Sequence, residues 1–131
     1  MMKIKYTKHI NTYDPVSISW EYQGKDVEID FNTPITGVYS EPLSCVVVEV
    51  YSENLLNFYS LDGGLISSER LPELENYQFR GITKSIKSKT GVSFLFHPSN
   101  DQVGNKWGDT EQYELTNDKE HRLGQNIGIY R

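Results

Sequence analysis

The chain has 131 residues, and its 13 basic and 18 acidic side chains give a formal net charge of −5. This length suits one domain, because two halves would be too small to hold independent cores. The negative charge argues against a general binder of nucleic acid or anionic membranes. No apolar run is long enough to span a bilayer, the N-terminus has no signal-peptide stretch, and the single cysteine fits a reducing cytoplasm without disulfides.

The first predicted element is a hairpin over residues 16–31. Apolar and polar residues alternate from Val16 to Tyr22 and again from Val27 to Phe31. A glycine-containing turn, Gln23-Gly24-Lys25, separates the two stretches. Two alternating runs around such a turn are typical of a β-hairpin with one face in water.

A central meander is predicted over residues 46–68. Two nearly continuous apolar runs, Val46–Tyr51 and Leu55–Leu61, indicate strands that are buried on both faces. The turn at Asp62-Gly63-Gly64 then starts a third strand at Leu65, since glycine reaches positive φ at little cost.

C-terminal hairpins are predicted over residues 79–130, and the segment before them, Glu73–Tyr77, is compatible with one turn of helix. The expected strands are residues 79–87, 92–96, 113–115 and 127–130. No segment has the period of a helix of normal length. Residues of the predicted core are Val48, Val50, Phe58, Leu61, Phe94 and Leu95.

These elements predict an all-β fold, a single antiparallel domain of consecutive hairpins. The sequence around Tyr59 and Leu61 is echoed around Tyr113 and Leu115, in the manner of the outer hairpin of a β-propeller blade. Two such units cannot close a ring, so the meanders are expected to pack as a sandwich or an incomplete barrel. The alternative is that any two hairpins look this much alike.

Residues that could carry catalysis are scattered. His9, His97 and His121 lie far apart and have no metal-ligand spacing. Cys45 has no basic neighbour to activate a thiol, so it is expected to be a small core residue. Neither a nucleophile elbow nor a phosphate-binding glycine loop occurs. We therefore expect no catalytic residue, no metal and no cofactor; a small hydrolase or nuclease using the histidines is kept as the remote alternative.

Candidate partner-binding residues lie in two places. One is the long polar loop before the strand at Tyr113, together with the start of that strand. There we expect Trp107 to be an apolar anchor, with Asp109 and Glu111 as a charged rim. The alternative is that the tryptophan folds back as a lid over the end of a sheet. The other is an acidic stripe on the wet face of the first hairpin, which could instead merely guard a sheet edge. The candidates are Trp107, Asp109, Glu111 and Asp101 in the first place, and Asp26, Glu28 and Asp30 in the second.

A resemblance extends over residues 40–130. The chain resembles a group of small bacterial immunity proteins in four segments. These are Val46–Tyr51, Asn54–Ile66 with its Tyr-Ser-Leu-Asp-Gly-Gly sequence, Tyr77–Ile82 and the Tyr113-Glu114-Leu115 triplet. Those proteins are encoded beside polymorphic or contact-dependent growth-inhibition toxins. This chain departs from their layout at Thr116-Asn117, and its first hairpin has no counterpart.

The resemblance implies a non-enzymatic protein that binds and neutralises a cognate toxin domain in the cytoplasm. Many such toxins are nucleases with basic active sites, which an acidic face would complement. The expected partner is therefore a basic toxin domain, with no direct nucleic-acid or membrane partner, and the expected state is a monomer or weak oligomer. The alternative function is a small β domain that binds a ligand or peptide, or acts as a scaffold.

Overall fold

The computed structural model describes residues 2–11, 13–99 and 109–130 and is all-β, with antiparallel strands throughout these ranges. The only helical element among them is a single 3₁₀ turn, η1 (Tyr51–Glu53). The chain forms two compact units, Met1–Leu71 and Pro72–Arg131. The all-β fold class predicted from the sequence is confirmed.

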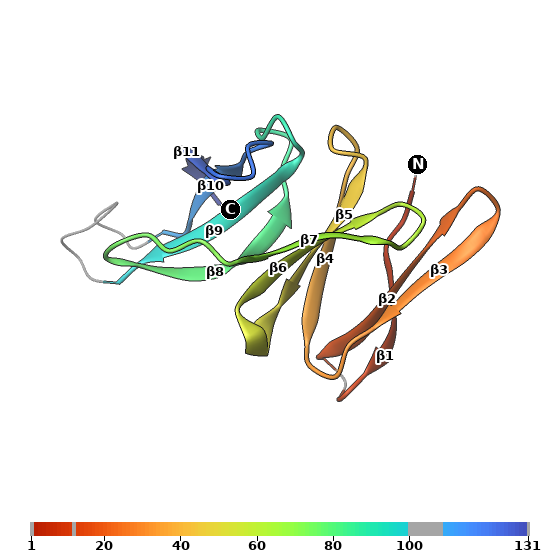
Figure 1. Cartoon of the computed structure of the whole chain (residues 1–131). Helices are drawn as coiled ribbons and strands as arrows, with labels where there is room; N and C mark the ends of the chain where they lie inside the picture. The colour runs from red at the N-terminus through yellow and green to blue at the C-terminus, as the bar shows by residue number, and fades with distance from the viewer. Residues whose placement is uncertain (1, 12, 100–108, 131) are drawn as a thin grey trace. The chain divides into compact units, whose positions relative to one another are not determined.

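The first unit contains two sheets (Figure 1). Sheet A has the order β1-β2-β3, and sheet B has the order β4-β5-β6-β7. The strands of sheet A are β1 (Lys5–His9), β2 (Pro15–Tyr22) and β3 (Lys25–Asp30). The strands of sheet B are β4 (Ile35–Ser40), β5 (Cys45–Val50), β6 (Leu55–Ser60) and β7 (Leu65–Arg70).

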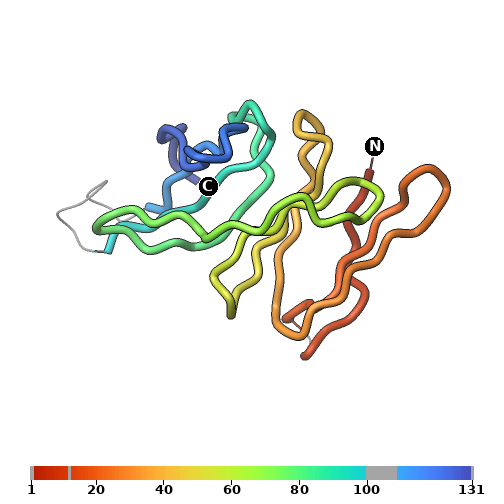
Figure 2. The backbone as a smooth tube through the Cα atoms, viewed as in Figure 1, coloured from red at the N-terminus to blue at the C-terminus, as the bar shows by residue number. Residues whose placement is uncertain are grey.

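The predicted first hairpin is β2 and β3. Gln23 and Gly24 have φ angles of 52° and 78°, so both adopt the left-handed conformation that a two-residue hairpin turn needs. Tyr22 then pairs with Lys25, and Ile18 with Ile29. Figure 2 shows the chain reversing at this turn.

The core of the first unit lies between sheets A and B, so these two sheets form a sandwich. Its buried members come from both sheets: Ile18, Trp20, Ile35, Val46, Val48, Val50 and Tyr59. All six residues of β5 are buried, as the nearly continuous apolar run predicts; Cys45 is among them, and so is the one charged residue of the run, Glu49. Leu61 is the exception among the predicted core residues. It is only partly buried directly after β6, and its carbonyl oxygen accepts a hydrogen bond from Trp20 Nε1 at 2.8 Å.

The second unit contains sheet C, a four-stranded meander in the order β11-β10-β9-β8. Its strands are β8 (Tyr77–Lys84), β9 (Val92–Pro98), β10 (Glu111–Leu115) and β11 (Leu123–Ile129). One face is aromatic: Phe79 lies 5.5 Å from Phe96 and 6.1 Å from Phe94 between ring centroids, with edge-to-face geometry. These ring pairs fix the side chains of the face, because aromatic rings prefer this arrangement.

Two predicted details of the chain differ from the structure. The segment compatible with a helical turn, Glu73–Tyr77, forms a tight turn closed by the Tyr77 N–H to the Leu74 oxygen at 3.0 Å. A helix cannot continue there because Asn76 has a φ of 68°. The central meander also has a fourth strand, β4, which the sequence analysis did not predict.

Candidate functional site

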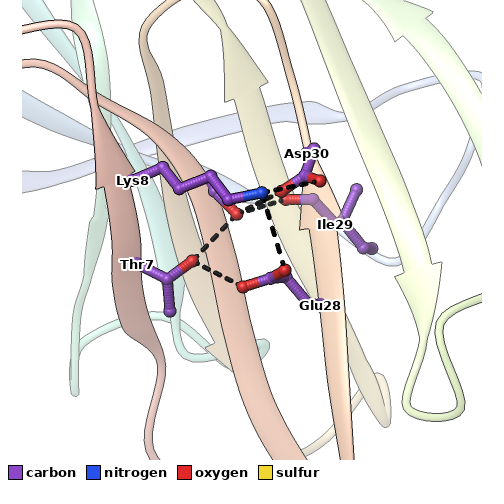
Figure 3. A network of polar contacts seen from close by, with 6 residues as sticks. Thr7, Lys8, Glu28, Ile29 and Asp30 are labelled. Atoms are coloured by element: carbon purple, nitrogen blue, oxygen red, sulfur yellow. Dashed lines mark hydrogen bonds and ion pairs between the residues drawn. The ribbon is translucent and has the colours of Figure 1, made fainter.

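The acidic stripe lies on the outer face of β3, opposite the core, as the alternation predicts. Lys8 on β1 reaches across the sheet to Asp30, with an Nζ–Oδ2 distance of 3.2 Å, and to Glu28 at 3.9 Å. The Thr7 hydroxyl donates to Glu28 at 2.8 Å. Figure 3 shows this network of β1 and β3 side chains.

These contacts weaken the stripe as a surface for a cationic partner. The Ser17 hydroxyl donates to Asp30 at 2.6 Å, and this bond, with the Lys8 ammonium, lowers the pKa of that carboxyl. Two of the three acids are thus engaged inside sheet A. Asp26 is exposed and has no ion pair within the described part of the chain.

The loop candidates lie only partly within the described residues. Trp107 and Asp101 lie outside them, so the anchor role of the tryptophan stays a prediction. Asp109 is half-buried, just before β10. Glu111, expected on an exposed rim, is instead only 4% exposed.

Glu111 is the centre of a buried polar cluster on the aromatic face of sheet C. Its Oε1 accepts hydrogen bonds from Asn126 Nδ2 at 2.8 Å and from the Tyr77 and Tyr113 hydroxyls at 3.3 Å each. The two tyrosine rings meet edge to face at 6.2 Å. Glu111 and Tyr113 are two residues apart on β10, so their side chains lie on one face. The expectation of a charged rim did not foresee that neighbouring side chains cover the Glu111 carboxylate, which makes it an internal hydrogen-bond acceptor for two tyrosines.

Both tyrosines of this cluster are hard to ionise. Burial, the neighbouring Tyr113 and the Glu111 charge raise the pKa of Tyr77 to about 12. Burial is also the main cause of the raised pKa of Tyr113. At neutral pH both phenols therefore keep the protons that they donate to Glu111.

This cluster predicts a loss of stability in alkali. The pKa of Tyr77 is about 12 in the folded chain, against an ordinary value of 10.0 when the chain is unfolded. The stabilisation of the folded state by the protonated Tyr77 is therefore complete below pH 10.0 and is lost as the pH rises through about 12. The free energy of unfolding should fall less steeply over that pH range in Tyr77→Phe than in the parent chain. Urea titrations at several alkaline pH values measure this. Identical slopes for both proteins would show that Tyr77 ionises normally.

Other acids of the stretch 109–120 support turns. Glu114 Oε2 accepts the backbone N–H of Lys89 at 2.8 Å, which ties β10 to the turn between β8 and β9. Asp118 Oδ1 accepts the backbone N–H of Glu120 at 3.0 Å. The charge of this stretch is therefore less available to a partner than its sequence suggests.

A groove in the second unit brings aromatic and acidic side chains together. It has a volume of about 620 Å³ and lies where the chain enters β8. Its lining residues are Pro72, Glu73, Leu74, Glu75, Tyr77, Phe79 and Phe96. Tyr77 and Phe79 are half-buried, whereas Glu73 and Glu75 are exposed. A concave surface that combines aromatic and charged side chains can serve as a binding site.

The groove is built on fixed backbone. The turn that closes at Tyr77 precedes β8, and the Ser99 N–H donates to the Asn76 oxygen at 2.8 Å. Phe79 pairs with Phe96 across β8 and β9. The aromatic wall and the acidic segment are thus held by hydrogen bonds to the same sheet.

The sequence analysis did not single out Glu73 and Glu75. A signal is present in the order of residues: Pro72 keeps the segment out of a strand, and the carboxylates then precede a Tyr-x-Phe alternation. Two nearby carboxylates at the start of an aromatic strand are less conspicuous than the acid-rich stretch 109–120. The two sets of carboxylates differ in the structure: Glu73 and Glu75 are exposed, whereas Glu111 is buried and Glu114 accepts a backbone hydrogen bond.

The histidines do not converge with other metal-binding groups in the described ranges. His97 Nδ1 lies 3.2 Å from the Thr110 hydroxyl. Across residues 2–11, 13–99 and 109–130 the structure contains no group of three or more His, Cys, Asp or Glu side chains arranged to hold a metal. Within the same ranges, none of the helical structure has the length and apolarity needed to cross a membrane.

Comparisons with known proteins leave the groove as the main guide to function. No protein-family model matches the chain. Searches of curated proteins and of solved structures also give no significant match. The physical properties of the described residues therefore carry the functional proposal.

Proposed function

We propose that the protein is a non-enzymatic immunity protein that binds and neutralises a basic toxin domain, most simply a nuclease, in the cytoplasm. The observation that carries this proposal is the groove of the second unit. It combines the half-buried rings of Tyr77 and Phe79 on β8 with the exposed side chains of Glu73 and Glu75 just before that strand. Aromatic anchors beside charges of one sign are typical of protein interfaces.

The charge of this surface supports a cationic partner. Neither Glu73 nor Glu75 has a salt bridge to another described residue, in contrast to Glu28 and Asp30. No lysine or arginine is among the described residues that line the groove. A toxin surface that holds nucleic-acid phosphates is basic, so it would meet complementary charge here.

Reversing the charge of the groove should slow association with the toxin domain. For the double variant Glu73→Lys/Glu75→Lys, we expect an association rate at least about tenfold lower at low ionic strength, with the difference shrinking as salt rises. The measurement is surface plasmon resonance, with the product of the toxin-encoding frame expected immediately upstream as the partner. Glu21→Lys/Glu120→Lys is the matched control, because both glutamates are exposed and outside the groove. If the control slows binding as much as the groove variant does, net charge alone drives the association.

A second candidate function is a small ligand- or peptide-binding domain. The volume of the groove, about 620 Å³, falls within the range of small-molecule sites and favours this alternative. The two functions differ in one measurable property. An immunity protein abolishes the activity of its partner, whereas a peptide-binding domain only occupies a segment of it.

A further inference from the structure

We propose that the groove of the second unit receives an arginine side chain of the partner protein, with the guanidinium plane stacked on Tyr77 or Phe79 and its N–H groups directed to Glu73 and Glu75. This inference rests on the proposed function and specifies the partner's contact group. It is carried by the lining residues, their exposure and their hydrogen bonds.

The aromatic wall suits a cation. Tyr77 and Phe79 are two residues apart on β8, so both side chains lie on the same face of sheet C. Their rings are held by edge-to-face contacts, Tyr77 with Tyr113 at 6.2 Å and Phe79 with Phe96 at 5.5 Å. Such a wall is already ordered before a ligand arrives, and the face of an aromatic ring attracts a cation.

The buried Glu111 strengthens the attraction of the Tyr77 ring for a cation. The Tyr77 hydroxyl points at the carboxylate and donates to its two oxygens, at 3.3 and 3.4 Å. This arrangement fixes the orientation of the ring. A hydrogen bond from the phenol to a full negative charge also polarises the ring toward greater electron density, which favours a cation on its face.

The acidic segment determines the sign and shape of the ligand. Glu73 and Glu75 are exposed and contribute two negative charges to the groove, and none of the lining residues that the structure describes is cationic. A guanidinium is planar, donates several hydrogen bonds to carboxylates and stacks on aromatic rings, whereas a lysine ammonium is a strongly hydrated point charge. Arginine is therefore the side chain that uses both the wall and the acids.

The test is an NMR titration of the full ¹⁵N-labelled chain with the capped peptide acetyl-Gly-Arg-Gly-amide. We expect saturable shifts that are largest at the amides of Tyr77, Phe79 and their neighbours. The corresponding citrulline peptide has nearly the same shape without the charge and should bind at least about fivefold more weakly. The lysine peptide should also bind more weakly than the arginine peptide.

Two variants localise the binding. Glu73→Gln/Glu75→Gln should weaken the arginine peptide by about fivefold or more, whereas Glu21→Gln/Glu120→Gln, which removes the same charge elsewhere, should leave it unchanged. Equal binding of the arginine and citrulline peptides, equal binding of the lysine peptide, or shifts centred on Asp26 would overturn the proposal. So would an absence of shifts at millimolar peptide.

The peptide titration and the toxin neutralisation test can fail independently of each other. If the arginine peptide fails while the toxin domain is still bound and neutralised, the groove is not the contact site and the immunity function stands. If the peptide binds in the groove while no toxin is neutralised, the arginine site stands and the chain is a peptide-binding domain.

Discussion

Phe94→Ala should lower the free energy of unfolding by about 3–5 kcal/mol. Phe94 lies on β9 with no exposed surface, and its ring packs edge to face on Phe79. Truncation removes the transfer free energy of the ring and leaves a cavity that the neighbouring rings of a stiff sheet cannot fill completely. For a domain of this size, the loss is a large part of the total stability.

Urea unfolding followed by circular dichroism measures this loss. Ile86→Ala is the matched control in the same unit, because Ile86 is 99% exposed and its truncation should change stability by no more than about 0.5 kcal/mol. If Phe94→Ala were as stable as the control, the aromatic face of sheet C would not be a close-packed core.

Trp20→Ala should be equally costly in the first unit, about 3–5 kcal/mol. The side chain is 2% exposed and lies in the core between sheets A and B. Its Nε1–H donates to the Leu61 carbonyl oxygen at 2.8 Å, which connects β2 of one sheet to the residue that follows β6 of the other. Truncation therefore removes packing and also leaves a carbonyl oxygen without this donor.

Trp20→Phe separates the two contributions. It keeps an aromatic ring in the core and loses the hydrogen bond, so its cost should be smaller than that of Trp20→Ala. Tyr13→Ala, at a position that is 86% exposed, is the neutral control. Circular dichroism serves as the probe because the substitution removes one of the chain's two tryptophans. A Trp20→Ala chain as stable as the Tyr13→Ala chain would contradict the sandwich core.

The elements that the sequence predicted well are those whose side chains alternate or are uniformly apolar. The hairpin of β2 and β3 has an alternating pattern that only one register satisfies, since a slip of one residue would bring its carboxylates into the core. The apolar run of β5 was long enough to predict burial on both faces. Such patterns indicate directly which side chains are buried, so they can be interpreted without knowing which elements pack against the strand.

Strands β1 and β4 were missed because their stabilising contacts lie elsewhere in the chain. All five residues of β1 are exposed, so no apolar pattern marks them. On β4, Gly37 interrupts the strand signal. Its N–H donates to the Tyr6 hydroxyl on β1 at 3.0 Å, a contact between residues 31 positions apart. Pairing of this kind depends on the tertiary structure.

The surroundings of individual carboxylates were the hardest feature to predict, because the sequence shows which residues are acidic but not which of them other side chains cover. Glu111 belongs to an acid-rich stretch, yet its carboxylate is covered by Tyr77, Tyr113 and Asn126. Glu73 and Glu75 attracted no attention, yet they are exposed beside an aromatic wall. Only the three-dimensional arrangement distinguishes a carboxylate that holds the fold together from one that is available to a partner.

The most direct test of the account is a neutralisation titration. The proposed function predicts a toxin domain encoded immediately upstream, and its activity is measured while this chain is added in increasing amounts, with the Glu73→Lys/Glu75→Lys chain in parallel. We expect toxin activity to fall to the background level near one equivalent of the parent chain, whereas the groove variant should need a clear excess. Full toxin activity in the presence of a saturating amount of the parent chain would contradict it.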